Sequence, residues 1–197
     1  CLAVADGVSS CRWAKKGSLA AVDTICHLAV AISEGTMESQ DIDGIRRYVV
    51  RDWKNHFQSD WNDYGTTLNF AVVHKNDLVV GQIGDGLLLL RNGDENINIT
   101  DMDEFYSAET YALSEVVLKS SFNVIYTERK GTVAIFAMTD GIGKEIEIEQ
   151  IEEFKESLIK LMKLHEKDIE SEIREWISLL NEKNNDDKSI GMLILEE

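Results

Sequence analysis

The chain has 197 residues, 44% of them hydrophobic, and a formal net charge of −16. This length and apolar content fit one domain with a substantial core. The negative charge argues against nucleic acids and anionic membranes as partners, because proteins that bind such surfaces gather Lys and Arg against phosphate. An acidic protein that handles phosphate therefore needs a bound cation.

The three cysteines, Cys1, Cys11 and Cys26, lack paired metal-ligand spacing. An odd number of cysteines in a chain of this size does not indicate a disulfide framework, so we expect a reducing, cytoplasmic setting. No stretch approaches the apolar length of a membrane span, and no basic-then-apolar leader precedes the first strand, so we expect a soluble protein.

The first third of the chain predicts a strand followed by two helices. Residues 1–5 form an apolar run that stops at Asp6-Gly7, as expected of a buried strand that meets a sharp turn. Apolar residues then recur at helical spacing over residues 17–32 and 42–57. Asp6 is therefore predicted to lie at the end of a strand.

Four short apolar runs follow, and they predict further strands over residues 67–73, 78–83, 87–91 and 97–100. The connections between them are short and rich in Gly, Asn and Asp. Parallel pairing needs a long crossover, so we predict antiparallel hairpins at each of these turns. Asp85 lies in the turn Gly84-Asp85-Gly86. We expect it to shape a hairpin near the candidate metal-binding residues described below, rather than to bind metal itself.

Two more strands and two helices are predicted in the last third. The strand over residues 132–138 stops at Asp140-Gly141, and the strand over residues 190–195 follows Asp186-Asp187. Between them, apolar residues at helical spacing predict amphipathic helices, over residues 151–164 and 169–180.

Asp6, Asp140 and Asp186 all lie at the mouths of predicted buried strands. A sheet can bring such side chains together, and clustered carboxylates repel one another unless a cation joins them. Oxygen ligands of this kind suit Mg²⁺ or Mn²⁺, whereas Zn²⁺ favours His and Cys, and the four histidines show no ligand spacing. The competing interpretation is that each Asp only caps a turn, since Asp-Gly is a common hairpin signal.

Five short motifs, taken together and in order, resemble those of the protein phosphatase 2C family. They are Ala5-Asp6-Gly7, Gly65-Thr66-Thr67, Gly84-Asp85-Gly86, Thr139-Asp140-Gly141 and Asp186-Asp187-Lys188-Ser189. The Gly84-Asp85 turn lacks the Ser-Arg that follows it in many eukaryotic relatives, which favours a compact bacterial-type member. A third interpretation, an unrelated acidic α/β domain, requires all five motifs to coincide by accident.

The resemblance implies an α+β fold, with two antiparallel β-sheets packed as a sandwich and helices on both outer faces. It also implies two Mg²⁺ or Mn²⁺ ions. Asp6 would bridge them, the carbonyl of Gly7 would complete one site, and Asp140 with Asp186 would hold the second. Asp187 is a secondary candidate, because relatives often have Asn at its position.

The implied activity is that of a hydrolase, a metal-dependent protein serine/threonine phosphatase. By this resemblance, a metal-bridging water would attack the phosphorus of phosphoserine or phosphothreonine. The implied partners are a phosphoprotein substrate and, as a candidate, a cognate Ser/Thr kinase in bacterial signalling. The alternative is a phosphatase-like binding or regulatory module with impaired catalysis.

Active relatives carry an Arg that grips the substrate phosphate on a strand before the Ala-Asp-Gly motif. This sequence begins at Cys1, inside its first apolar run. We therefore expect residues 1–197 to form a single phosphatase 2C-like domain without that first strand.

Overall fold

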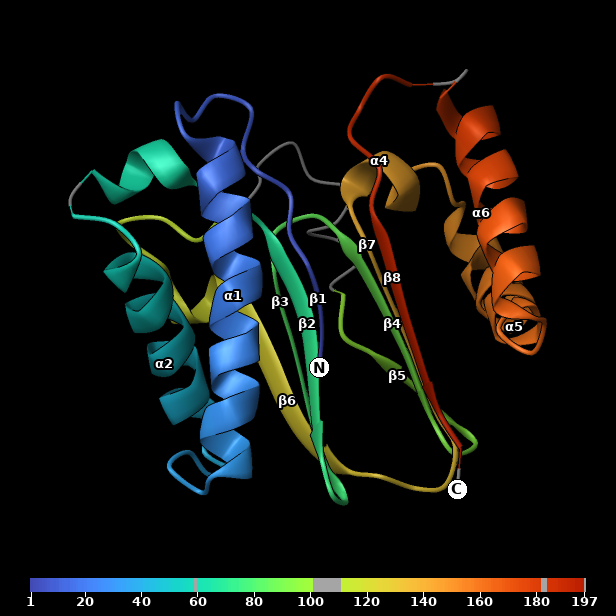
Figure 1. Ribbon diagram of the computed structural model, residues 1–197, viewed down its shortest axis with the longest axis horizontal. Helices are drawn as coiled ribbons and strands as arrows, with labels where there is room; N and C mark the ends of the chain where they lie inside the picture. The colour runs from blue at the N-terminus through green and yellow to red at the C-terminus, as the bar shows by residue number, and fades with distance from the viewer. Residues whose placement is uncertain (59, 101–110, 182–183, 197) are drawn as a thin grey trace.

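A computed structural model describes residues 1–58, 60–100, 111–181 and 184–196 of the chain. Two four-stranded antiparallel sheets pack face to face, and helices cover their outer faces (Figure 1). The strand order is β1-β2-β3-β6 in the first sheet and β5-β4-β7-β8 in the second. The predicted α+β sandwich is therefore confirmed.

The observed elements match most of the predicted ones to within a few residues. The strands are β1 (Leu2–Val4), β2 (Leu68–His74), β3 (Asp77–Ile83), β4 (Leu87–Asn92), β5 (Glu95–Asn98), β6 (Phe122–Glu128), β7 (Val133–Met138) and β8 (Ile190–Leu195). The helices are α1 (Ala14–Ser33), α2 (Ile42–Asn55), α4 (Asp140–Gly143), α5 (Ile151–Leu161) and α6 (Glu166–Asn181), and the 3-10 helices are η1 (Trp61–Tyr64), η2 (Lys119–Ser121) and η3 (Ile148–Gln150).

The core has three apolar layers because successive strand residues point to opposite faces of a sheet. In β3, Val79 packs in the layer beneath α1 and α2, while its neighbour Val80 packs between the two sheets. A third layer joins the second sheet to α5 and α6, and it contains Phe136 and Leu158. No helix in the described ranges combines the length and apolar character that crossing a membrane requires.

One predicted hairpin is wrong. The turn Gly84-Asp85-Gly86 does not pair β3 with β4, because β3 pairs with β2 and β6 while β4 pairs with β5 and β7. The turn instead carries the chain from the first sheet to the second. Gly84 permits this change of direction with a positive φ of 101°.

Three local features differ from the predictions. Strand β6 had no predicted counterpart, although it pairs with β3 along seven residues. Strand β5 covers Glu95–Asn98 rather than residues 97–100, because the β4–β5 hairpin closes at Asn92 and Glu95. The predicted turn at Asp140-Gly141 is the start of the short helix α4.

Candidate metal centre

The ends of three strands from both sheets lie at one level of the sandwich. Val4 at the end of β1 pairs with Asn69 of β2, in the first sheet. The side-chain amide of Asn69 donates a hydrogen bond of 2.9 Å to the carbonyl of Met138, which ends β7 in the second sheet. Met138 in turn pairs with Ile190, the first residue of β8. The segments that continue beyond these residues therefore emerge at the same end.

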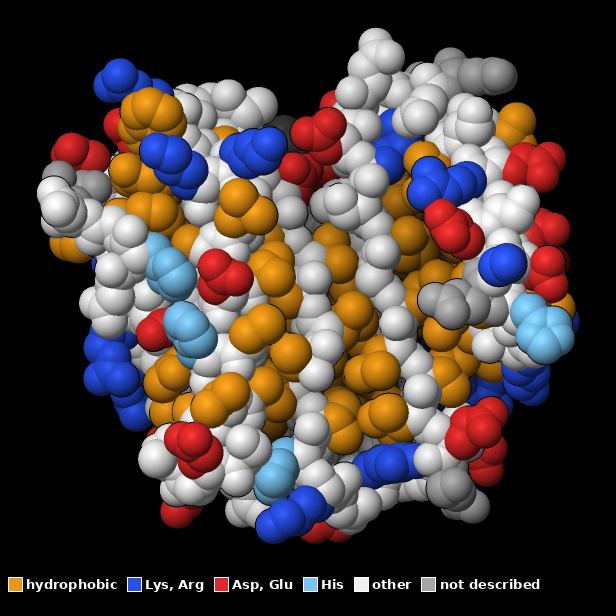
Figure 2. Space-filling view, in the orientation of Figure 1, with side chains coloured by type: hydrophobic (Ala, Val, Ile, Leu, Met, Phe, Trp, Pro, Cys, Tyr) orange, Lys and Arg blue, Asp and Glu red, His pale blue; other side chains and the backbone are white. Residues whose placement is uncertain are grey.

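The predicted metal-binding aspartates lie on those segments. Asp6 follows β1, Asp140 is the first residue of α4 directly after β7, and Asp186 and Asp187 precede β8. Figure 2 shows acidic side chains gathered at the upper end of the sandwich, between the layers of α1 and α4.

Electrostatics link four of the carboxylates at this end. The pKa of Asp6 is raised from 3.8 to about 6, first by burial and then by the negative charges of Asp140, Asp187 and Asp85. A hydrogen bond from the backbone of Gly7 lowers this pKa and offsets part of the rise. Asp6 is half-buried among like charges, an arrangement that a divalent cation would relieve.

This raised pKa predicts that Asp6 destabilises the metal-free protein at neutral pH. Folded Asp6 keeps its proton up to about pH 6, whereas the unfolded carboxyl releases it near 3.8. The folded state therefore binds more protons within this window, and its stability falls as the pH rises through it. After allowance for partial solvent screening, we expect Asp6→Asn to raise the free energy of unfolding by about 1 kcal/mol at pH 7.5 without metal.

Urea unfolding of the metal-free protein at pH 7.5 and pH 4.5 measures this effect, with Asp94→Asn in the exposed β4–β5 turn as the matched control. The gain from Asp6→Asn should shrink at the lower pH, while the control should change little at either. A loss of stability in Asp6→Asn at pH 7.5 would contradict the electrostatic account.

Two threonines fix the segment that carries Asp6. The backbone N–H of Asp6 donates to Oγ1 of Thr67 at 3.1 Å. The carbonyl of Asp6 accepts from the backbone N–H of Thr67 at 2.8 Å and from Oγ1 of Thr66 at 2.9 Å. From the sequence, Gly65-Thr66-Thr67 was identified only as one of five motifs, without a bond to Asp6. Membership of that ordered set was the one available signal for these threonines.

A third threonine ties the loop of Asp186 and Asp187 to the end of β7. Oγ1 of Thr139 donates to the carbonyl of Asp187 at 3.0 Å and accepts from the backbone N–H of Ser189 at 3.0 Å. Gly141 lets this loop come close, because a Cβ there would lie 2.6 Å from the carbonyl oxygen of Asp187 and 3.0 Å from Cβ of Asp186. The segments of Asp140 and Asp186 are therefore in contact.

Lys144 is a functional candidate that the sequence did not reveal. Its ammonium group lies 2.8 Å from the carboxylate of Asp85 and 3.0 Å from that of Asp140. Burial lowers the pKa of Lys144, but the hydrogen bonds and charges of the two carboxylates raise it more. Lys144 therefore supplies one positive charge to the acidic cluster and connects the turn of Asp85, which is buried, with α4.

The donor set at this end suits hard divalent cations. It consists of carboxylate oxygens together with the backbone carbonyl of Gly7, and it includes no His or Cys among the predicted ligands. In the described part of the chain, the only group of three or more His, Cys, Asp or Glu ligand atoms within 4.8 Å of one another lies elsewhere, at His27, Asp52 and His56. The wider spacing of the strand-end carboxylates suits two ions that keep several waters better than one fully caged ion.

Solved structures that resemble the chain include a serine/threonine phosphatase from Mycobacterium tuberculosis and a bacterial serine phosphatase. The Mycobacterium tuberculosis serine/threonine phosphatase PstP/Ppp aligns with a TM-score of 0.65 and 17% identity over 99% of this chain and 88% of its own. The PstP catalytic domain in complex with 2 manganese ions aligns with a TM-score of 0.64 and 16% identity, over 98% of this chain and 87% of its own. PppA, a key regulatory component of T6SS in Pseudomonas aeruginosa, aligns with a TM-score of 0.62 and 12% identity, over 99% of this chain and 85% of its own.

At these identities the structural likeness establishes the fold. No curated protein sequence matches the chain. The sequence profile of protein phosphatase 2C, however, matches residues 1–178, which is most of its length. The chain belongs to the protein phosphatase 2C family.

Proposed function

We propose that the protein is a metal-dependent phosphatase that hydrolyses phosphoserine and phosphothreonine in other proteins. The observation that carries the proposal is the half-buried carboxylate of Asp6, which shares one end of the sandwich with Asp140, Asp187 and Asp85. Membership of the protein phosphatase 2C family and the manganese-bound PstP relative support two Mg²⁺ or Mn²⁺ ions. We also propose that the chain acts as a single domain.

In this proposal, Asp6, the carbonyl of Gly7, Asp140 and Asp186 hold the metal ions. The contact between the loop of Asp186 and Gly141 supports Asp186, while the effect of Asp187 on the pKa of Asp6 supports Asp187 as a further contributor. When bound, divalent ions supply an activated water and offset the charge of the transferring phosphoryl group.

The residues around the ligands keep this site in position. Thr66 and Thr67 donate hydrogen bonds to the Asp6 carbonyl, and these bonds fix the backbone that carries the Asp6 carboxylate after β1. Gly7 allows a close approach to the start of α1, because a Cβ there would lie 2.6 Å from the carbonyl carbon of Ala14. These contacts keep the ligand positions in place before substrate binds, as catalysis by positioned charges requires.

The ion pairs of Lys144 favour a second candidate function, in which the protein is a binding or regulatory module with impaired turnover. The ammonium group of Lys144 already neutralises part of the charge of Asp85 and Asp140. A metal ion must therefore compete with Lys144 for Asp140.

An assay of phosphate release distinguishes the two functions. We expect Mn²⁺ to activate hydrolysis of a phosphothreonine peptide by the purified protein, and EDTA to abolish it. The corresponding phosphotyrosine peptide serves as the specificity control. Mn²⁺ binding by calorimetry without hydrolysis would instead support the binding module, and hydrolysis that persists in EDTA would contradict both functions.

A further inference from the structure

A second group of metal-ligating side chains lies on the outer surface of the helix layer, away from the strand ends. His27 comes from α1, Asp52 from the last turn of α2, and His56 is the C-cap of α2. One ligand atom of each lies within 4.8 Å of the others. Nδ1 of His27 is 2.8 Å from Oδ2 of Asp52, and Nε2 of His56 is 4.0 Å from the same oxygen.

Helix geometry and helix packing explain how these side chains meet. Asp52 and His56 are four residues apart and therefore lie on one face of α2. Helices α1 and α2 run side by side in opposite directions (Figure 1), and buried residues such as Leu28 and Val49 join them. This packing brings His27 of α1 next to Asp52. Figure 2 shows two histidine side chains together on the surface over these helices.

The two imidazole rings lie parallel, and each presents a nitrogen near the carboxylate of Asp52. The rings of His27 and His56 are stacked with centroids 6.0 Å apart and an interplanar angle of 6°. Around tetrahedral Zn²⁺, ligand atoms at about 2.0–2.2 Å from the ion lie about 3.3 Å from one another. The observed distances of 2.8 and 4.0 Å lie on either side of this value, so small side-chain rotations would suffice.

The chemistry of this group differs from that of the strand-end centre. Two imidazole nitrogens and one carboxylate oxygen favour Zn²⁺, whereas ligands that are all oxygen favour Mg²⁺ or Mn²⁺. The side chains of His27, Asp52 and His56 are 54%, 23% and 26% exposed, so an ion can reach them from solvent. We propose that His27, Asp52 and His56 form a Zn²⁺ site that links α1 to α2, with a fourth position open to water.

Calorimetric titration of the whole protein with Zn²⁺, in excess Mg²⁺ to occupy the strand-end centre, tests the proposal. We expect His27→Ala and His56→Ala each to weaken the binding of one Zn²⁺ at least tenfold. His74→Ala, at the end of β2, is the matched control and should bind as the wild type does. The proposal would be overturned if the wild type bound no Zn²⁺, or if a double variant with both His27→Ala and His56→Ala bound Zn²⁺ as well as the wild type does.

Co²⁺ provides a second readout that does not depend on activity. We expect the visible absorption of tetrahedral Co²⁺ in the wild type and in His74→Ala, and its loss in His27→Ala with His56→Ala. The melting temperatures of the metal-free variants check folding, with His27→Gln as a milder substitute. Tetrahedral absorption that survives in a folded double variant would place the ion elsewhere and overturn the proposal.

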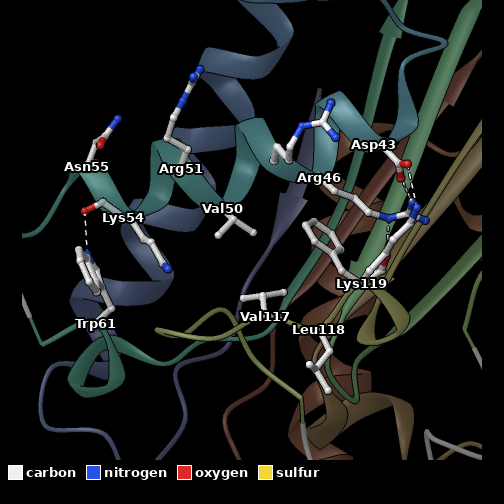
Figure 3. Close-up of a pocket in the computed structure, with 12 residues that line it drawn as sticks. Asp43, Arg46, Val50, Arg51, Lys54, Asn55, Trp61, Val117, Leu118 and Lys119 are labelled. Atoms are coloured by element: carbon white, nitrogen blue, oxygen red, sulfur yellow. Dashed lines mark hydrogen bonds and ion pairs between the residues drawn. The ribbon is translucent and has the colours of Figure 1, made fainter.

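A different observation, a groove of 620 Å³ between α2 and the segment that leads into β6, supports a separate inference. Figure 3 shows its lining, with apolar side chains such as Val50, Val117 and Leu118 between α2 and this segment. Leu118 remains 55% exposed.

The rim of this groove is basic, although the chain carries a net charge of −16. Its charged lining comprises one acidic and five basic residues: Asp43, Arg46, Arg47, Arg51, Lys54 and Lys119. Asp43 is already paired with Arg46 and Lys119, while Arg47 and Arg51 are exposed. We propose that the groove binds an acidic peptide segment of a partner protein through an aliphatic anchor residue.

Fluorescence anisotropy with a labelled acidic peptide that contains one Leu tests this second proposal without measuring phosphatase activity. We expect the double variant Arg47→Glu, Arg51→Glu to bind at least tenfold more weakly, and Lys163→Glu, on the far helix layer, to bind as the wild type does. Replacing the peptide Leu by Ser should weaken binding too. Unchanged peptide binding in the double variant would overturn the proposal. It would also be overturned if the same arginines bound anionic lipid vesicles and the protein did not bind the peptide.

Discussion

We expect Asp140→Asn to lower kcat/KM for a phosphothreonine peptide about 10³-fold, which corresponds to about 4 kcal/mol of transition-state stabilisation. The substitution removes one carboxylate of the proposed metal centre and leaves the size of the side chain nearly unchanged. It also removes one of the two carboxylates that Lys144 contacts, while Asp85 remains as its partner. The fold should therefore survive, and the loss should arise from weaker metal binding.

Steady-state kinetics over a range of Mn²⁺ concentrations, together with calorimetric Mn²⁺ titration, measure this effect. Asp94→Asn, in the exposed β4–β5 turn, is the control for a lost surface carboxylate and should keep wild-type values. A variant Asp140→Asn with nearly wild-type kcat/KM and Mn²⁺ affinity would remove Asp140 from the proposed centre.

We expect Gly141→Ala to lower kcat/KM about 10²-fold without removing any ligand. Gly141 lies within helix α4, where Ala is intrinsically favoured over Gly. The new Cβ would lie 2.6 Å from the carbonyl oxygen of Asp187, so the backbone of the loop must shift. The shift moves Asp186 and Asp187 away from Asp140 and should weaken Mn²⁺ binding as well.

The matched control is Gly35→Asn, after α1. Gly35 has a positive φ of 72° that Asn tolerates, and a Cβ there meets nothing within 4 Å. The control should retain full activity. Wild-type kinetics in Gly141→Ala would mean that the spacing between α4 and the loop of Asp186 does not matter for catalysis.

Most of the fold was predictable because its strands are apolar runs bounded by turn residues. The runs at β2, β3, β4, β7 and β8 gave strands close to their predicted limits. Strand β6 was missed although Phe122, Val124 and Tyr126 alternate with neighbours on the other face, since its Asn, Thr and Glu make the run less apolar. Its main partner, β3, is also distant in sequence.

The turn Gly84-Asp85-Gly86 shows where local rules fail. A short connection normally joins paired strands, yet here the chain passes from one sheet to the other. Only the packing of the two sheets determines this outcome, because the turn residues themselves suit either arrangement. The side chain of Gln82 donates to the carbonyl of Gly86 and so closes the turn from within the sandwich.

The candidate ligands could be predicted, but the groups that position them could not. Asp6 and Asp140 each follow an apolar strand, which is a signal within a few residues of sequence. The bonds of Thr139 to the loop before β8, and of Lys144 to Asp85, span 48 to 59 residues. The group of His27, Asp52 and His56 likewise depends on how two helices pack, so the histidines showed no ligand spacing.

The most direct measurement is an anomalous difference map from crystals of the protein grown with Mn²⁺. We predict two peaks at the strand ends, with the Asp6 carboxylate within about 2.2 Å of both and Asp140 on one of them. The same map identifies Asp186 or Asp187 as the third carboxylate. Manganese bound away from Asp6 and Asp140, or none at this end of the sandwich, would contradict the proposed centre.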